Sequence, residues 1–375
     1  MTVRQLKSKN DKPVPFNDLT RIHLPLLPEF GESLIRLVSS SSLVLGEELK
    51  SFELELAKEE DSKFAIGVNN GTNAIELALR ALGIGAGDEV LVPAFTFVAT
   101  AFAVTQIGAI PVLVDVNENT GLLDINSARG AISNKTKALI LVTIHGRTDS
   151  LIEYREFCEE LKISFIIDGA QSHLSTYGGN KLINYCDIST LSFYPGKNLG
   201  ALGEGGAILT NSEEIDSKLK LMRDWGAERK YDHSTWGGNF RLEPLQASFL
   251  RTKLRKLQEW TDDRIRIANI YRGEMNREIL MDQVSEKGSH VYHIFALKVE
   301  NRENVEHIFN DLKISYGFHY PRAIHQNKAY KDLIKSPVSL DSSENLASQT
   351  ISLPIFPNQT ESEIERVINA VKLIK

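Results

Sequence analysis

Two residues with the side chains needed for covalent chemistry each come after a short apolar run that reads as a buried strand. Asp168 directly follows residues 164–167, and Lys197 lies in the segment after residues 188–191. A carboxylate at the end of a buried strand is costly unless it has a partner. Lys197 stands among glycine and proline, which is a poor setting for a solvated helix face. Read singly, Asp168 fits a cap or a loop ion pair, and Lys197 fits a surface charge.

The two residue types together indicate a more specific chemistry. Lysine is the side chain that forms Schiff bases with pyridoxal phosphate. An aspartate that pairs with the pyridinium nitrogen is its usual companion. No cluster of His, Cys or acidic residues near Asp168 in the sequence completes a metal site. A ring nitrogen is therefore a better partner for Asp168 than a metal ion, and we predict no metal site.

A third candidate site, for an anion, lies where a helix is expected to begin. Gly71 and Thr72 follow the apolar run 64–69 and open a helical pattern. Free backbone N–H groups and the helix dipole converge at such a terminus and bind phosphate. A plain helix cap by Thr72 explains the same residues and is common. The segment is not a Walker loop, because no Gly-Lys-Ser/Thr follows, and it lacks the dinucleotide fingerprint.

The segments that position these residues alternate between strand-like and helix-like patterns of apolar residues. We expect helices at 49–59, 72–82, 97–107, 151–161 and 213–223. We expect strands at 64–69, 89–92, 111–116, 138–144, 164–167, 188–193 and 207–210. The alternation predicts an α/β fold whose largely parallel sheet is covered on both faces. Ligands of such a sheet bind at the carboxyl ends of the strands, where the candidate residues lie.

The rest of the chain predicts a second domain. A charged helical stretch at 245–277 is followed by a strand at 291–299 and by helices at 305–312 and 361–374. We predict a large domain at 1–259, which includes the N-terminal segment, and a smaller α+β domain at 260–375. Because termini often lie close together, the N-terminal segment could instead join the smaller domain.

Composition limits the partners and the compartment. The 375 residues are 42% hydrophobic and 25% charged, with a formal net charge of −6. An acidic balance argues against bulk nucleic-acid binding but permits a local anion pocket. Two cysteines in so long a chain make no disulfide framework, the first 13 residues are polar, and no run reaches the ~20 apolar residues that span a bilayer. We therefore expect a cytoplasmic protein with no nucleic-acid or membrane partner.

The ordered set of motifs resembles the DegT/DnrJ/EryC1/StrS family of nucleotide-sugar aminotransferases, of aspartate aminotransferase fold type I. The resemblance covers residues 14–357. Each motif alone is weak, and their order and spacing together are specific. The motifs are Gly-Thr-Asn-Ala at 71–74, Pro-Ala-Phe-Thr-Phe-Val-Ala-Thr at 93–100, Asp-Gly-Ala-Gln at 168–171, residues 192–206, Gly-Asn-Phe-Arg-Leu at 238–242 and His-Tyr-Pro at 319–321.

The resemblance implies roles for the cofactor residues. Lys197 holds pyridoxal 5'-phosphate as a Schiff base and later moves the proton, and Asp168 pairs with the pyridine nitrogen. Phe97 stacks on the ring face, where an aromatic side chain binds favourably, and Gln171 lies near the ring or its 3-hydroxyl. By residue type alone, Phe97 also fits a core aromatic and Gln171 a loop amide. The residues implied to hold the phosphate are Gly71, Thr72 and Ser192.

The resemblance also implies an assembly and a substrate. Asn239 reaches the phosphate from a second subunit, which implies a homodimer with shared active sites, although Asn239 also fits a turn residue. Arg241 is a candidate for holding a substrate carboxylate or phosphate. His319 and Tyr320 open a segment like that of relatives that act at the 3-position of the sugar. The implied reaction moves an amino group from L-glutamate to a nucleotide-linked keto-sugar, in the first instance a dTDP-linked 3-keto-deoxysugar.

Alternatives remain open from the sequence. Amination of a 4-keto nucleotide sugar or of a keto-cyclitol would use the same cofactor residues. A sugar dehydratase relative would carry histidine in place of Lys197, and a non-catalytic regulatory protein could keep the fold. Two departures from the family pattern occur: Gly169 stands where alanine is usual, and His145-Gly146-Arg147 replaces a His-Leu-Tyr-Gly type motif. The second departure could alter the substrate side of the site.

Overall fold

The computed structural model describes residues 12–281 and 283–374. Its centre is a seven-stranded sheet in the order β1-β10-β9-β6-β4-β2-β3. Strand β10 runs antiparallel to both of its neighbours, and the remaining pairs are parallel. The seven strands predicted between residues 64 and 210 are all present in this sheet, and the mostly parallel α/β sheet is confirmed. The strands are β1 (Phe64–Val68), β2 (Glu89–Pro93), β3 (Ile110–Val114), β4 (Thr136–Val142), β6 (Ser164–Asp168), β9 (Ile188–Ser192) and β10 (Gly206–Thr210).

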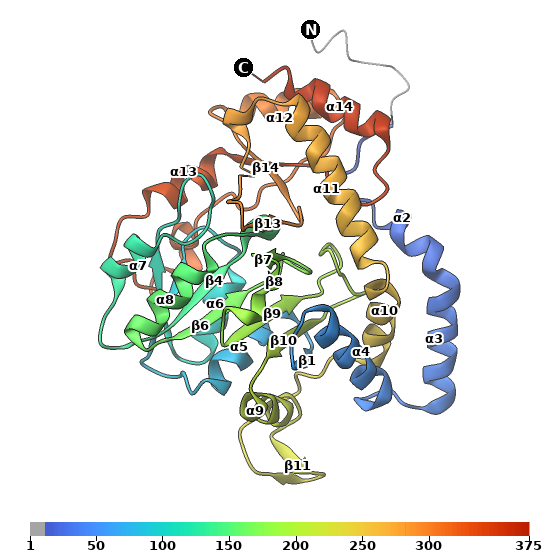
Figure 1. Cartoon of the computed structure of the whole chain (residues 1–375), viewed down its shortest axis with the longest axis vertical. Coiled ribbons are helices and arrows are strands. Elements are labelled where there is room, and N and C mark those ends of the chain that lie inside the picture. The colour runs from blue at the N-terminus through green and yellow to red at the C-terminus, as the bar shows by residue number, and fades with distance from the viewer. Residues whose placement is uncertain (1–11, 282, 375) are drawn as a thin grey trace.

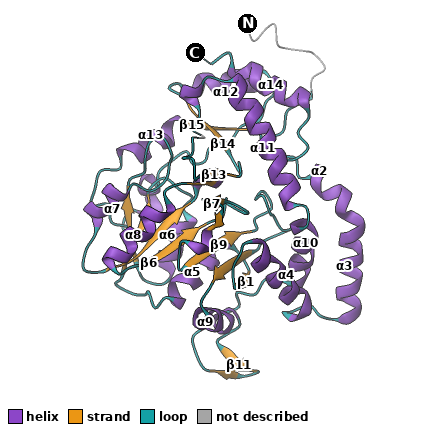
Figure 2. Ribbon diagram, in the orientation of Figure 1, coloured by secondary structure: helices purple, strands orange, loops and turns teal. Residues whose placement is uncertain are grey.

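Helices cover both faces of this sheet (Figure 2). Helices α5 (Gly71–Ala81) and α6 (Ala99–Gln106) pack on one face, where Val90 and Val92 of β2 point. Leu91, between them, points to the other face and packs with α7 (Ile125–Ala131) and α8 (Leu151–Leu161). Such alternation along an almost wholly apolar strand is what a sheet buried on both faces requires. Helix α9 (Glu213–Arg223) lies beside α5.

A group of helices that includes an unpredicted one closes the end of the sheet near β1. Helix α4 (Gly46–Glu59) packs on β1 and on α10 (Pro244–Leu254). The sequence analysis missed α2 (Thr20–His23) and α3 (Leu27–Ser40), and α3 lies along α10. Phe30 of α3 meets Phe249 of α10 with ring centroids 4.8 Å apart.

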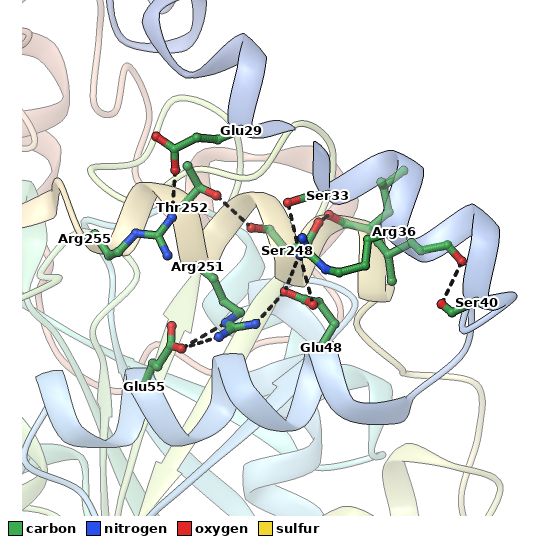
Figure 3. Close-up of polar contacts among 12 residues, drawn as sticks. Glu29, Ser33, Arg36, Ser40, Glu48, Glu55, Ser248, Arg251, Thr252 and Arg255 are labelled. Atoms are coloured by element: carbon green, nitrogen blue, oxygen red, sulfur yellow. Dashed lines mark hydrogen bonds and ion pairs between the residues drawn. The ribbon is translucent and has the colours of Figure 1, made fainter. Parts of the chain in front are cut away.

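Ion pairs between these helices fix the outer side of α10 (Figure 3). Arg251 contacts Glu48 and Glu55 of α4 at 2.6 Å each, and Arg255 contacts Glu29 of α3 at 2.8 Å. Single exposed ion pairs contribute little stability. Here they join three helices, so they restrict how α10 lies against α3 and α4.

A second hydrophobic core holds the C-terminal part of the chain together. Helix α11 (Leu257–Glu274) leads from α10 to α12 (Arg302–Asp311) and α14 (Glu361–Val371), and β14 (Phe295–Lys298) pairs antiparallel with β15 (Thr350–Leu353) (Figure 1). Val14 packs in this core and donates its N–H to Lys313 O at 2.9 Å. The division at 259 and 260 stays a prediction, and α11 runs across it. Residues 1–11 of the predicted N-terminal segment lie outside the described residues.

The remaining elements are short. Helix α13 (Asp341–Gln349) precedes β15. The strand pairs are β5 (Arg147–Thr148) with β13 (Ser289–His290), β7 (Thr176–Tyr177) with β8 (Asn180–Lys181), and β11 (Ala227–Arg229) with β12 (Asp232–His233). The β11–β12 hairpin projects from the body beyond α9 (Figure 1). Among the described helices, none combines the length and the apolar character needed to cross a bilayer.

Candidate active site

Asp168 ends β6 at the carboxyl edge of the parallel strands, as predicted, and its side chain is buried. Thr100 Oγ1 donates to Asp168 Oδ2 at 2.8 Å, and the N–H of Ala170 donates to Oδ1 at 3.1 Å. Burial raises the pKa of Asp168, while the two hydrogen bonds and the charge of Lys197 oppose the rise. A cationic ring nitrogen in contact with this carboxylate would oppose it further.

Lys197 lies in a closed loop that follows β9. Its N–H donates to Tyr194 O at 2.9 Å, and the N–H of Ala201 donates to Phe193 O at 2.8 Å, which closes the loop. Burial lowers the pKa of Lys197 from 10.5 to about 8, and the charge of Asp168 opposes that fall. A lysine with a lowered pKa has more of the neutral amine that attacks a carbonyl.

The predicted anion site forms where α5 begins beside the end of β9. Gly206 of β10 pairs with Val68 of β1 on one side and with Ser192 of β9 on the other. A Cβ on Gly71 would lie 2.7 Å from Ser192 Cβ, so the two residues meet closely. A Cβ on Gly206 would lie 2.8 Å from Gly71 N, so only glycine fits there. The structure thus brings Gly71 and Ser192 together at a helix N-terminus, which suits a phosphate.

The alternative interpretation of this terminus, a cap by Thr72, is wrong. The capping residue is Asn70, whose side chain accepts from Asn73 N at 2.8 Å. Thr72 is the second residue of α5, and its backbone N–H belongs to the first turn, where helical N–H groups have no partner within the helix.

Phe97 and Tyr320 lie together at the same edge of the sheet. The predicted helix at 97–107 begins only at Ala99, so Phe97 lies in the loop before it and is 53% exposed. Its ring centroid lies 5.5 Å from that of Tyr320 at an interplanar angle of 35°. An exposed aromatic face of this kind is available for a planar ligand.

Gln171 links the residues of two loops. Its Oε1 accepts from His145 N at 2.5 Å, and its Nε2 donates to Tyr320 OH at 3.0 Å. His145 Nε2 and the His319 carbonyl oxygen are 2.9 Å apart. The predicted residues Gln171, His319 and Tyr320 therefore form one network with His145.

Asn239 and Arg241 lie on the segment that leads from the β11–β12 hairpin to α10, and this segment passes beside the end of β1, where Arg241 pairs with Val68. Asn239 is exposed, and its Oδ1 accepts from Arg241 Nε at 2.9 Å. Arg241 Nη1 is 3.2 Å from Asp224 Oδ1. These contacts connect Asn239 to the hairpin region rather than to Asp168 or Lys197.

The sequence analysis assigned no role to four residues of the site: Thr100, His145, His173 and His293. His173 is buried, and burial together with the charge of Lys197 lowers its pKa to about 3. Burial lowers the pKa of His145 to about 4. His293 lies 3.3 Å from Asn198 through Nδ1 and Oδ1, and its pKa is also lowered by burial. These imidazoles are therefore neutral at pH 7 and add no positive charge beside Lys197.

The departure at His145-Gly146-Arg147 has a clear physical consequence. A Cβ on Gly146, at φ +95°, would lie 2.7 Å from Gln171 O, so glycine allows the loop to approach Gln171. The Arg147 side chain is fully buried and donates from Nη1 to Thr120 O at 3.1 Å and to Met281 O at 3.3 Å. His145 of this motif contacts the predicted site, and Arg147 supports the loops around it.

This donor set fits pyridoxal phosphate. An amine of lowered pKa stands near a buried carboxylate, a helix N-terminus offers N–H groups to a phosphate, and an exposed aromatic ring lies at the same strand ends. A two-part α/β chain with such a site defines the class of fold type I Schiff-base enzymes.

Comparison with known proteins gives the family. The family model for the DegT/DnrJ/EryC1/StrS aminotransferase family matches residues 28–372, and the chain belongs to that family. It is 35% identical over 96% of its length to the Erythromycin biosynthesis sensory transduction protein EryC1 of Saccharopolyspora erythraea, of which 99% is covered. It is 35% identical over 98% of its length to a dTDP-3-amino-3,4,6-trideoxy-alpha-D-glucose transaminase of Streptomyces venezuelae, of which 98% is covered.

A solved structure agrees. The crystal structure of S. venezuelae DesV in complex with a ketimine intermediate matches 96% of this chain and 98% of that chain, with a TM-score of 0.93 and 35% identity. The predictions of the family, of fold type I, of an aminotransferase and of pyridoxal phosphate as its cofactor are confirmed. The roles of the individual site residues stay predictions.

Proposed function

We propose that this protein transfers an amino group from L-glutamate to the 3-keto group of a dTDP-linked deoxysugar in the cytoplasm. The observation that carries the reaction type is Lys197, an amine of lowered pKa that is electrostatically coupled to the buried Asp168. Both cysteines are free, which is in keeping with a reducing compartment.

Each residue of the site has a separate role in the proposed reaction. Pyridoxal phosphate, when bound, supplies an electron sink for the donor carbon. Lys197 would hold the cofactor and would move the proton at the donor carbon. Asp168, positioned by Thr100 and Ala170, keeps the ring nitrogen protonated. Gly71, Thr72 and Ser192 would hold the phosphate, and Phe97 would stack on the ring.

Two observations support the substrate. The assignment to the 3-position of the sugar rests on the segment that begins at His319 and Tyr320. Tyr320 is hydrogen-bonded to Gln171, one of the proposed cofactor residues. The S. venezuelae relative is named for a dTDP-3-amino product. The EryC1 relative carries a regulatory name. Retention of Lys197 and Asp168 favours an enzyme over a protein that only binds, and it disfavours a dehydratase.

A substrate panel tests this function. Purified protein with added pyridoxal phosphate and L-glutamate should release 2-oxoglutarate fastest with a dTDP-3-keto-deoxysugar, compared with 4-keto nucleotide sugars and a keto-cyclitol. Borohydride reduction followed by peptide mapping should place the cofactor on Lys197. Turnover of only a 4-keto sugar or a cyclitol would correct the substrate, and absence of any reducible adduct at Lys197 would overturn the function itself.

We further propose a homodimer in which Asn239 completes the phosphate site of the partner subunit. The exposed position of Asn239, with its contacts to Arg241 and not to Ser192, supports this. A second support is the outer face of α3, where Leu34, Ile35 and Val38 are exposed at helical spacing. A stripe of apolar side chains on one helix is typical of an interface.

Mixed dimers test the shared site. In a dimer of one Lys197→Ala subunit and one Asn239→Ala subunit, one site carries both changes and the other carries neither. Mixing equal amounts of the two proteins after reversible dissociation should therefore raise the activity above the mean of the parents, and random pairing restores about one quarter of the sites. A mixture of each variant with itself is the control. Activity equal to the mean of the parents would place Asn239 in its own subunit's site.

A further inference from the structure

A buried lysine of α10 contacts the loop that carries Lys197. Lys253 is on α10, and its side chain is 0% exposed. Its Nζ donates to the carbonyl oxygen of Gly200 and lies 3.0 Å from His23 Nε2 of α2. Lysine is almost never fully buried without a reason, because desolvating its charge is expensive.

The surroundings of Lys253 are apolar. Leu250 and Leu254 of α10 pack in one core cluster with Leu199 and Ala201 of the Lys197 loop. An apolar residue would fill this position without the desolvation cost, so packing alone does not account for a lysine here. Burial lowers the pKa of Lys253 to about 7, and the amine remains a hydrogen-bond donor in either protonation state.

The carbonyl that Lys253 holds belongs to a tight part of the loop. A Cβ on Gly200 would lie 2.3 Å from Pro195 O, so the two arms of the loop touch at this point. Lys197 lies between them in the sequence. A group that fixes Gly200 therefore limits how far the Lys197 backbone can move.

Other contacts hold the same loop, and one of them also comes from α10. Gln246 Oε1 accepts from Leu202 N at 2.9 Å. On the other side, Asn198 Nδ2 donates to Val291 O at 3.2 Å. Gln246 and Lys253 are two helical turns apart on α10, so the inner side of this helix supports the segment after Lys197, while Arg251 and Arg255 fix its outer side (Figure 3).

His23 completes the arrangement. Burial and the charge of Lys253 lower the pKa of His23 to about 4, so its ring is neutral at pH 7 and Nε2 can accept. Lys253 thus has one acceptor in the active-site loop and one in α2. The Lys253 amine therefore connects the active-site loop to α2.

We propose that Lys253, held by His23, is a positioning residue for Lys197: it fixes the Gly200 carbonyl and thereby the backbone that places the Lys197 amine. This inference rests on the proposed role of Lys197. Lys253 does not touch the reacting atoms, so its effect on the reaction passes through the loop.

Hydrogen–deuterium exchange of the cofactor-free protein is the first test. The amides of Lys197, Ala201 and Leu202 are hydrogen-bonded and report directly on the loop. Lys253→Met keeps the length of the side chain and removes the donor. We expect exchange in residues 197–202 to become about tenfold faster or more, because one hydrogen bond from an amine stabilises the closed loop by that factor. Lys256→Met, an exposed change near the end of the same helix, is the matched control and should leave exchange there unchanged.

Kinetics separate positioning from stability. With cofactor bound, the maximal single-turnover rate with L-glutamate should fall about tenfold in Lys253→Met, while the half-saturating glutamate concentration stays unchanged. Lys253→Gln, which keeps a shorter donor, should recover part of the rate. A variant that lowers only the melting temperature, with normal exchange in 197–202 and a normal rate, would overturn the inference.

A second pair of variants covers the case in which Lys253→Met does not fold. His23→Gln keeps an acceptor for Lys253, and His23→Leu removes it, so only the second should speed exchange of the loop. Equal exchange in the two proteins would contradict the proposed link. The exchange measurements need no cofactor. Trapping at Lys197 with unchanged exchange would therefore refute this inference alone. No trapping at Lys197 would refute the proposed function, and faster exchange in that case would leave only the effect of Lys253 on the loop established.

Discussion

Lys197→Ala should lower the rate of amino transfer by about 10⁴-fold or more, since it removes a proton carrier and the covalent attachment of the cofactor together. The measurement is release of 2-oxoglutarate from L-glutamate, together with loss of the borohydride-reducible absorbance. Lys218→Ala, an exposed lysine paired with Glu214 on α9, is the control and should keep full activity. An active Lys197→Ala protein would contradict the assignment of the reaction to this residue.

The same variant has a stability signature that does not depend on the cofactor. The pKa of Lys197 is about 8 in the folded chain, below its usual 10.5. Between these values the unfolded chain binds more protons at this position, so the free energy of unfolding of the cofactor-free protein rises with pH. Lys197→Ala lacks that rise. The difference in unfolding free energy, wild type minus variant, should therefore increase between pH 8 and 10.5. A difference that stays flat would mean that the amine is not buried.

Residues at strand ends were predictable, because their positions follow from a local pattern. Asp168, Lys197 and Gly71 each come after an apolar run, and the carboxyl ends of neighbouring strands meet at one edge of the sheet. His145 and His173 follow β4 and β6 in the same way, so the same rule would have found them.

Residues that reach the site from distant segments were not predictable from local pattern. His293 and Lys253 come from the C-terminal part and from α10, and the tertiary fold alone brings them to Asn198 and Gly200. Thr100 is one residue into a helix, where a hydroxyl has no distinguishing spacing. Helix α3 was missed although Glu29, Glu32 and Arg36 mark a polar side at helical spacing, so the periodicity used for the other helices would have found it.

The strand predicted in the C-terminal part of the chain shows a related limit of prediction from local pattern. The strand predicted at 291–299 is only β14, Phe295–Lys298, because the residues before it turn toward the site, where His293 meets Asn198. Residues that leave an apolar run to contact another loop carry the same side-chain pattern as a strand. Local periodicity predicts which residues are buried more reliably than it predicts what they are buried against.

Asp168→Asn should lower the rate by about 100-fold or more, as single electrostatic contributors to catalysis do. Asparagine keeps the shape of the side chain, and its Oδ1 can still accept from Ala170 N, as Asp168 does at 3.1 Å. The lost property is the negative charge that holds a proton on the ring nitrogen. The measurement is the single-turnover rate with L-glutamate, and Thr100→Val, which removes one donor to the carboxylate and keeps its charge, should have a smaller effect.

Stability distinguishes this role from that of a structural cap. Burial raises the pKa of Asp168 above its usual 3.8, so the folded chain binds the extra proton and ionising the group costs stability as pH rises above that value. Asparagine carries no such cost. The cofactor-free Asp168→Asn protein should therefore be at least as stable at pH 7 as the wild type, while its rate is low. A protein whose structural cap has lost its charge is less stable, whereas a protein whose buried catalytic anion has been neutralised is more stable. A variant that is less stable but turns over normally would therefore show that Asp168 serves only to tie the end of β6 to Thr100 and Ala170.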